Sequence, residues 1–172
     1  MTGKKFLNSL ANGKTDILQL LLDKLYELKT NYCVIGGLAV NAYADPVASL
    51  DLDIVLAIND IDKFLNHVKE TFVINKFKHS INLSHKDSDL RIQLQTDKRY
   101  QVFIDRASEK TVLGYKMKVA SLEDVLNGKM WAYMDEERRK SKRQKDLADI
   151  MRLVETHPHL YQSLPDNIKT LI

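Results

Sequence analysis

The sequence predicts an α/β (α+β) domain that ends in a helical extension. Short apolar runs rich in β-forming residues alternate with stretches whose apolar residues recur at helical spacing. The 172 residues suffice for one compact domain, and no repeat or low-complexity linker divides them. We expect a core at residues 1–120 and a helical segment at residues 121–172 packed on the same domain.

The first half of the chain alternates between helical and extended patterns. A wide apolar stripe begins at residues that can cap a helix, Thr15 or Asp16. A later apolar run ends at Gly36-Gly37, where a strand must turn sharply, and Pro46 prevents the next helix from continuing. The expected elements are a helix at 15–29, a strand at 32–35, a helix at 38–44, a strand at 50–58 and a helix at 60–70.

The second half begins with strands and ends with helices. Three short β-rich runs precede a segment whose aromatic and apolar residues recur at helical spacing. Ser121 and the acidic residues after it favour a helix start. Pro158 stops the following helix, and Pro165-Asp166 starts a last one. The expected elements are strands at 72–77, 81–85, 90–95 and 116–120, a helix at 97–108, a helix from 121 and a helix around 147–154.

Composition excludes several classes of protein. No apolar run is long enough for a signal peptide or for the roughly 18 residues of a membrane span, so we expect a cytoplasmic protein without membrane contact. Cys33 lies in an apolar run, which favours a buried, inert thiol. The five His residues lack zinc-binding spacing. The net charge of +3 is modest, but six of the 26 basic residues fall within 136–145.

Two carboxylates on one predicted strand are the strongest chemical signal. Because side chains alternate along a strand, Asp51 and Asp53 point the same way. Mg²⁺ usually takes one or two carboxylates together with substrate phosphates. Gly36 and Gly37 would let the backbone approach a phosphate at a helix start, and Ser49 could add a hydroxyl. A lone DxD or a lone glycine pair is more often structural, but their ordered combination indicates phosphoryl or nucleotidyl transfer.

The order of these motifs resembles a known superfamily. Gly36-Gly37, thirteen intervening residues and Asp51-Leu52-Asp53 resemble the nucleotidyltransferases typified by DNA polymerase β. The stretch 119–150 resembles the second signature of bacterial minimal nucleotidyltransferases related to AbiEii-type toxins. Its positions here are Lys129, Lys145-Asp146 and Asp149-Ile150.

This resemblance covers about residues 32–154 and carries expectations of fold and chemistry. It implies a short mixed β-sheet with helices on one face. It also implies transfer of a nucleoside monophosphate from an NTP to a hydroxyl, with Mg²⁺ or Mn²⁺ held by Asp51 and Asp53. Gly36, Gly37, Ser49 and Lys145 would contact the nucleotide.

Two positions depart from the pattern of the superfamily. Relatives carry a third carboxylate on a neighbouring strand, where this chain has Gln93, a neutral and weak metal ligand. Asp105 is the alternative acid, but it completes the site only if its segment is a strand, so we favour Gln93. Val47 stands where many relatives have an arginine. Both changes remove charge from the site.

Two residues of the second signature have competing interpretations. Lys129 is either a solvated lysine on an amphipathic helix or a phosphate contact. Asp146 is either the cap of the last long helix or the residue that orients Lys129 or the nucleotide. The basic run 136–145 is either a solvated face or a surface for triphosphate or RNA.

The sequence therefore supports one main hypothesis and two alternatives. The main one is a metal-dependent nucleotidyltransferase that acts on a hydroxyl of RNA (tRNA included), protein or a small molecule. The first alternative is a catalytically degenerate binding or regulatory module, with an antitoxin-like protein partner. The weaker alternative is an antibiotic nucleotidyltransferase.

Overall fold

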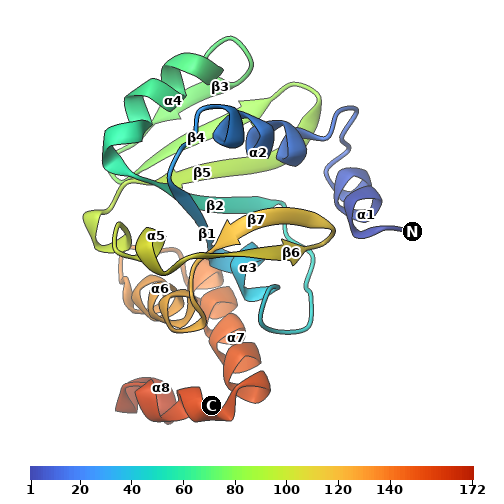
Figure 1. The fold of residues 1–172 in the computed structure, drawn as a ribbon. Helices are drawn as coiled ribbons and strands as arrows, with labels where there is room; N and C mark the ends of the chain where they lie inside the picture. Colours follow the sequence, from blue (N-terminus) through green and yellow to red (C-terminus); the bar gives the residue numbers. More distant parts are fainter.

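A single mixed β-sheet forms the centre of the molecule. The computed structural model describes residues 1–172, and Figure 1 shows the sheet with helices on either side. Its seven strands lie in the order β3-β4-β5-β2-β1-β7-β6. They are β1 (Tyr32–Ile35), β2 (Asp51–Leu56), β3 (Val73–Lys76), β4 (Ser80–His85), β5 (Ser88–Gln95), β6 (Ser108–Val112) and β7 (Tyr115–Val119). β2 is parallel to β5 and β1 is parallel to β7, whereas the other pairs are antiparallel, so the predicted mixed sheet is confirmed.

The two faces of β2 and its neighbours differ in polarity. On β2 the apolar face carries Leu52, Ile54 and Leu56, all buried. Ile92 of β5 and Leu83 of β4 continue this face into the next strands, because they are register partners. The opposite face of β2 begins with the two carboxylates, which are only partly buried. Further along the same face Val55 is fully buried, so the carboxylates lie at the start of β2, at the edge of the core.

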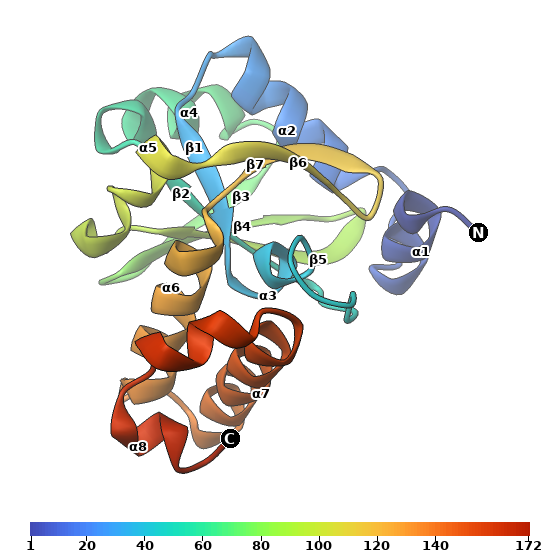
Figure 2. The same ribbon diagram turned by 60° about the horizontal axis from the view of Figure 1, so that its bottom comes forward.

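Helices lie on both sides of the sheet. In Figures 1 and 2, α2 and α4 lie on one side of the sheet, and α3, α6 and α7 lie on the other. Figure 2 shows α6 and α7 side by side, with α8 beyond them. The helices are α1 (Gly3–Leu10), α2 (Ile17–Glu27), α3 (Gly36–Val40), α4 (Ile61–Val68), α5 (Phe103–Arg106), α6 (Leu122–Met134), α7 (Lys140–Thr156) and α8 (Asp166–Lys169), with 3₁₀ turns at Ile58–Asp60, Lys98–Tyr100 and Pro158–Ser163.

Most predicted elements are confirmed, and their ends follow local chemistry. Asp16 caps α2 by accepting a hydrogen bond from the backbone N–H of Gln19. Ser121 caps α6 in the same way. None of the helices has the length and apolarity that a membrane crossing requires.

The predicted helix at 97–108 is wrong. This segment divides into the 3₁₀ turn Lys98–Tyr100 and the four-residue α5, and the chain is extended again at Ser108. The helical spacing of Tyr100 and Phe103 reflects packing, because both rings contact Trp131 of α6, with centroids 5.2 and 5.5 Å away.

Three other features differ from the sequence prediction. α1 and the edge strand β6 were not predicted, because short polar elements such as β6 lack apolar periodicity. β6 joins β7 through Leu113 and Gly114, which both have positive φ angles, as tight hairpin turns require. Helix α7 begins at Lys140, so Asp146 lies in the helix interior and the prediction that it caps the helix is wrong.

Candidate functional site

The glycine turn and the second carboxylate of β2 fit against each other. Gly36 has a φ of +69°, and a Cβ built on it would lie 2.9 Å from the Cβ of Asp53. A larger residue would meet both steric strain and a direct clash, so glycine is required here. Gly37 is less constrained, since a Cβ there would lie 3.9 Å from Asp149 Oδ2 and from Ser49 Oγ. The turn therefore places backbone directly beside Asp53.

A row of polar side chains crosses four strands at the level of Asp53. Asp53 is the register partner of Gln93, Gln93 of Asn82, and Asn82 of Asn75. Register partners point to the same face of a sheet, so these side chains form one row. Gln93 thus lies beside Asp53, where the resemblance implies a third acid.

Asp105 does not reach this row. It lies in α5 and lines a separate cavity with Asn31 and Ala57. Of these two residues only Gln93 lies beside Asp53.

Both oxygens of Asp51 are engaged by cations. Arg91 Nε of β5 lies 2.6 Å from Asp51 Oδ1, and Lys142 Nζ of α7 lies 3.1 Å from Asp51 Oδ2. Burial of Asp51 acts in the opposite direction, but these two cations hold its pKa below the usual value. Asp51 is therefore ionised and bound to two elements distant in sequence.

Asp53 has a different electrostatic environment. Burial raises its pKa above the usual value, and the negative charge of Asp51 adds to this, while Lys129 opposes it. Asp53 makes none of the ion pairs in the molecule. A metal ion close to Asp53 would stabilise its ionised form and so offset the free-energy cost of burying this carboxylate.

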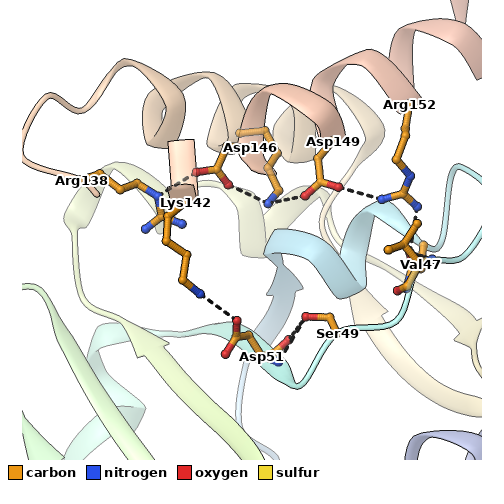
Figure 3. A network of polar contacts seen from close by, with 10 residues as sticks. Val47, Ser49, Asp51, Arg138, Lys142, Asp146, Asp149 and Arg152 are labelled. Carbon is orange, nitrogen blue, oxygen red and sulfur yellow. Dashed lines mark hydrogen bonds and ion pairs between the residues drawn. The ribbon is translucent and has the colours of Figure 1, made fainter. Parts of the chain in front are cut away.

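Helices α6 and α7 bring a buried ionic network to the edge of the site (Figure 3). Lys129 Nζ lies 2.9 Å from Asp146 Oδ1 and 2.8 Å from Asp149 Oδ2. All three side chains are at most 8% exposed. Burial works against the charged form of Lys129, but the two carboxylates raise its pKa. The interpretation of Lys129 as a solvated lysine is therefore wrong, and Asp146 holds Lys129 in place.

Two arginines close the ends of this network. Arg138 Nε lies 2.7 Å from Asp146 Oδ2, and Arg152 Nη1 lies 2.7 Å from Asp149 Oδ1. Arg152 also donates hydrogen bonds to Asn41 Oδ1 and to the carbonyl of Asp45. The network thereby ties α7 to the loop between α3 and β2.

The same loop carries Val47, the position where relatives have an arginine. Asn41 holds Val47 through hydrogen bonds to its backbone N–H and carbonyl, and Val47 as a whole residue is 49% exposed. Figure 3 shows the Arg152 guanidinium beside Val47. Positive charge at this loop thus comes from α7 and not from the loop itself.

The remaining predicted site residues divide into two groups. Ser49 accepts a hydrogen bond from the Asp51 backbone N–H and lies near Gly37, so it belongs to the site. Lys145 is exposed on α7 and lines neither of the two cavities at Asp53. Helix α3 has only five residues, so its dipole is a weak attraction for an anion.

The donors of this site suit one hard cation that is shared with phosphates. Asp51 and Asp53 offer carboxylate oxygens, and Gln93 offers an amide oxygen from the next strand. No group of three or more His, Cys, Asp or Glu side chains is placed to hold a metal ion. These residues therefore fit Mg²⁺ or Mn²⁺ with phosphate and water as further ligands, and do not fit an all-protein cage. A metal ion would compete with Lys142 and Arg91 for the oxygens of Asp51.

Known proteins resemble this chain in fold. No protein-family model matches the sequence, and no curated protein matches it either. Solved structures do match. One is ANT(2'')-Ia in complex with adenylyl-2''-tobramycin, at a TM-score of 0.59 and 13% identity, over 90% of this chain and 92% of that chain. This chain has the nucleotidyltransferase fold.

Two more structures with the nucleotidyltransferase fold show the same likeness. The lincosamide antibiotic adenylyltransferase LnuA, bound to lincomycin, matches at a TM-score of 0.57 and 15% identity, over 82% of this chain and 98% of that chain. An antigenic nucleotidyltransferase-like protein from Paracoccidioides brasiliensis matches at a TM-score of 0.56 and 19% identity, over 95% and 84%. The predicted superfamily fold is confirmed, while the resemblance to AbiEii-type toxins stays a prediction.

Sequence reasoning missed several charged residues that the nucleotidyltransferase fold brings to the site. Arg91 lies two positions before Gln93, so strand alternation places it on the same face and could have revealed it. Arg138 and Lys142 were noted only as members of the basic run. The spacing of Arg152 three residues after Asp149 on one helix could have revealed that pair, whereas its contacts with Asn41 and Asp45 join positions more than 100 apart.

Proposed function

We propose that this protein is a metal-dependent nucleotidyltransferase, which moves a nucleoside monophosphate from an NTP to a hydroxyl of RNA, protein or a small molecule. The observation that carries the proposal is the convergence at Asp53. The glycine turn packs against this carboxylate, Asp51 shares its strand face, and cations of α6 and α7 lie nearby. The likeness in fold to adenylyltransferases adds to it.

Each group of residues has a defined task in this proposal. Asp51 and Asp53 would hold Mg²⁺ or Mn²⁺, which when bound neutralises phosphate charge and aligns the transfer. Arg138 and Lys142 would bind the triphosphate, since both lie beside the carboxylates and keep part of their surface exposed. Asp146 and Asp149 would hold Lys129 in position at the rim of the site. Gln93 would add a neutral ligand but could not act as a base.

A second candidate function is supported by a specific observation. Gln93 lies where the resemblance implies an acid, and both oxygens of Asp51 are already paired with protein cations. These features favour a degenerate module that binds nucleotide or a protein partner without turnover. An antibiotic adenylyltransferase is a third candidate, on the strength of the acceptors in the similar structures.

Two measurements test the proposal and separate the candidates. Isothermal titration of each NTP with Mg²⁺ is expected to show binding by the wild type and a marked loss in Asp53→Asn. Incubation with labelled NTP is expected to label RNA, a protein or an added antibiotic. Absence of NTP binding by the wild type would contradict the proposal, and binding without any labelled product would favour the degenerate module.

A further inference from the structure

The sheet face that carries the carboxylates continues as a polar, uncovered surface. Beyond Asp53 the row of Gln93, Asn82 and Asn75 leads across β5 and β4 to the edge strand β3. A cavity of about 390 Å³ lies on this face, with Asp51 and Asp53 among its lining residues and Asn75 at its far side. The cavity is therefore continuous with the candidate catalytic carboxylates.

Three cations surround this cavity, and they come from two different elements. Arg91 projects from β5, while Arg139 and Lys142 come from the start of α7. Arg91 and Lys142 are paired with Asp51, but exposed Arg139 takes part in none of the ion pairs of the molecule. Arg139 therefore provides an unpaired positive charge in the part of the cavity that a ligand bound beside Asp51 would reach.

The floor of the cavity is suited to hydroxyl groups. Asn82 Oδ1 is buried and has no hydrogen-bond partner, an unfavourable state that a donor from a ligand or water would relieve. Asn75 and Ser84 add further polar groups along the same surface. No aromatic side chain lines the cavity, so stacking of a base or a planar drug is not provided for.

We propose that this cavity binds the acceptor, and that the acceptor carries both hydroxyl and phosphate groups. This inference rests on the proposed nucleotidyltransferase function. An acceptor hydroxyl oxygen would bond to the α-phosphorus of the NTP, the bond from that phosphorus to pyrophosphate would break, and the hydroxyl proton would pass to solvent. Arg139 and Arg91 would bind the acceptor phosphate, and the side-chain amide of Asn82 would form a hydrogen bond with a second hydroxyl.

Two sources share this chemistry: a small sugar phosphate, and the terminal ribose of an RNA chain with its adjacent phosphate. Polycationic aminoglycosides such as tobramycin fit poorly, because Arg91, Arg139 and Lys142 would repel their ammonium groups. We therefore expect this protein to bind an anionic acceptor, whereas the ANT(2'')-Ia complex contains an adenylyl derivative of the cationic tobramycin on a shared fold.

Nuclear magnetic resonance of the full chain tests the site directly. The side-chain amide signals of Asn75, Asn82 and Gln93 are followed during titration with ribose 5-phosphate, ribose, a short RNA with a free 3′-hydroxyl, and tobramycin. We expect at least one of the two phosphate ligands, ribose 5-phosphate and the RNA, to shift these signals. A larger shift with one of them identifies the source. Ribose and tobramycin are expected to have little effect. Equal shifts with ribose or tobramycin, or none with either phosphate ligand, would overturn the proposal.

Charge variants supply a matched comparison. Arg139→Glu is expected to weaken binding of the phosphate ligand by about tenfold or more, since it removes a charge-assisted contact. Asn75→Leu should also weaken it. Lys116→Glu, the control, makes the same change of charge at an exposed position on β7, and its affinity should match that of the wild type. Equal losses in Arg139→Glu and Lys116→Glu would show a nonspecific charge effect and contradict the proposal.

Titration of each NTP with Mg²⁺ in the same samples separates this inference from the proposed function. NTP binding without any effect of the phosphate ligands on Asn75 and Asn82 would contradict the acceptor site alone. Phosphate ligands that bind as expected in a protein that binds none of the NTPs would support the cavity as a sugar-phosphate site and contradict the nucleotidyltransferase function.

Discussion

Gly36 and Asp53 are in such close contact that no side chain fits between them. A Cβ on Gly36 would lie 2.9 Å from the Cβ of Asp53, and the backbone there has a φ of +69°. We therefore expect Gly36→Ala to destabilise the protein by at least about 1–2 kcal/mol, the usual cost of a left-handed conformation, with the clash added. Thermal unfolding followed by circular dichroism should show a lower Tm, and Mg-NTP binding should weaken because Asp53 is displaced.

Gly37→Ala is the matched control for this substitution. Gly37 has no positive φ, and the nearest atoms to an added Cβ lie 3.9 Å away. Alanine in the short helix α3 should leave the Tm unchanged or raise it, since alanine is the better helix former by about 1 kcal/mol. Similar losses of stability in both variants would show that the Gly36–Asp53 contact is not the cause.

Asp53 is expected to lower the stability of the folded protein near neutral pH. Because burial raises its pKa, the folded state keeps a proton that the unfolded chain has already lost between about pH 4 and the raised pKa. The free energy of unfolding should therefore fall as the pH rises through this window. Asp53→Asn should remove that fall and stabilise the protein at pH 7 by about 0.5–2 kcal/mol, while Mg-NTP binding is lost.

Asp51→Asn should change stability in the opposite direction. Lys142 and Arg91 lower the pKa of Asp51 against the effect of burial, so its stabilising contribution is present at neutral pH. It should disappear as the pH falls through the lowered pKa. Urea unfolding at pH 3 to 7 measures both variants. If Asp53→Asn and Asp51→Asn shift the free energy of unfolding in the same direction, the assigned electrostatics are wrong.

The sequence predicted the residues whose positions depend on local spacing. Asp51 and Asp53 share a face because strands have a period of two, and Gly36 ends β1 because the chain must turn there. For these two the evidence lies within about ten neighbouring residues. Gln93 was placed beside Asp53 by the resemblance to nucleotidyltransferases, because alternation within β5 does not show which strand it pairs with.

Contacts between distant segments could not be predicted in this way. The spacing of Tyr100 and Phe103 suggested a long helix, whereas both rings pack on Trp131 from separate short turns. Asp146 had the composition of a helix cap, but the helix formers before it extend α7 to Lys140. The contacts of Arg152 with Asn41 and Asp45 depend on how α7 crosses the loop after α3, which no local pattern records.

Gln93→Glu tests whether a third carboxylate would complete the metal site. The substitution keeps the side-chain length and adds an anionic oxygen beside Asp53. We expect the affinity for Mn²⁺, measured by electron paramagnetic resonance, to rise by about tenfold, because ligand charge dominates the affinity for hard cations. Transfer activity, where present, should rise with it.

Gln162→Glu provides the comparison for this gain. Gln162 is exposed in the 3₁₀ turn Pro158–Ser163 and lines neither of the two cavities at Asp53. The added charge lies outside the candidate site, so it should barely change the Mn²⁺ affinity. An equal gain in the two variants would indicate a general charge effect and not a third ligand.

Lys142 is expected to compete with metal ions and to assist the nucleotide. Its ammonium lies 3.1 Å from Asp51 Oδ2, and the side chain is 34% exposed. Lys142→Met frees this oxygen, so Mn²⁺ alone should bind up to about fivefold more tightly, in line with the 0–1 kcal/mol of partly exposed ion pairs. Mg-ATP should bind more weakly, because a cation that faces the triphosphate is lost.

A purely structural lysine would not move the two affinities in opposite directions. The control Lys140→Met, at an exposed position of the same helix turn, should move neither affinity. Affinities that fall together in Lys142→Met would contradict competition at Asp51.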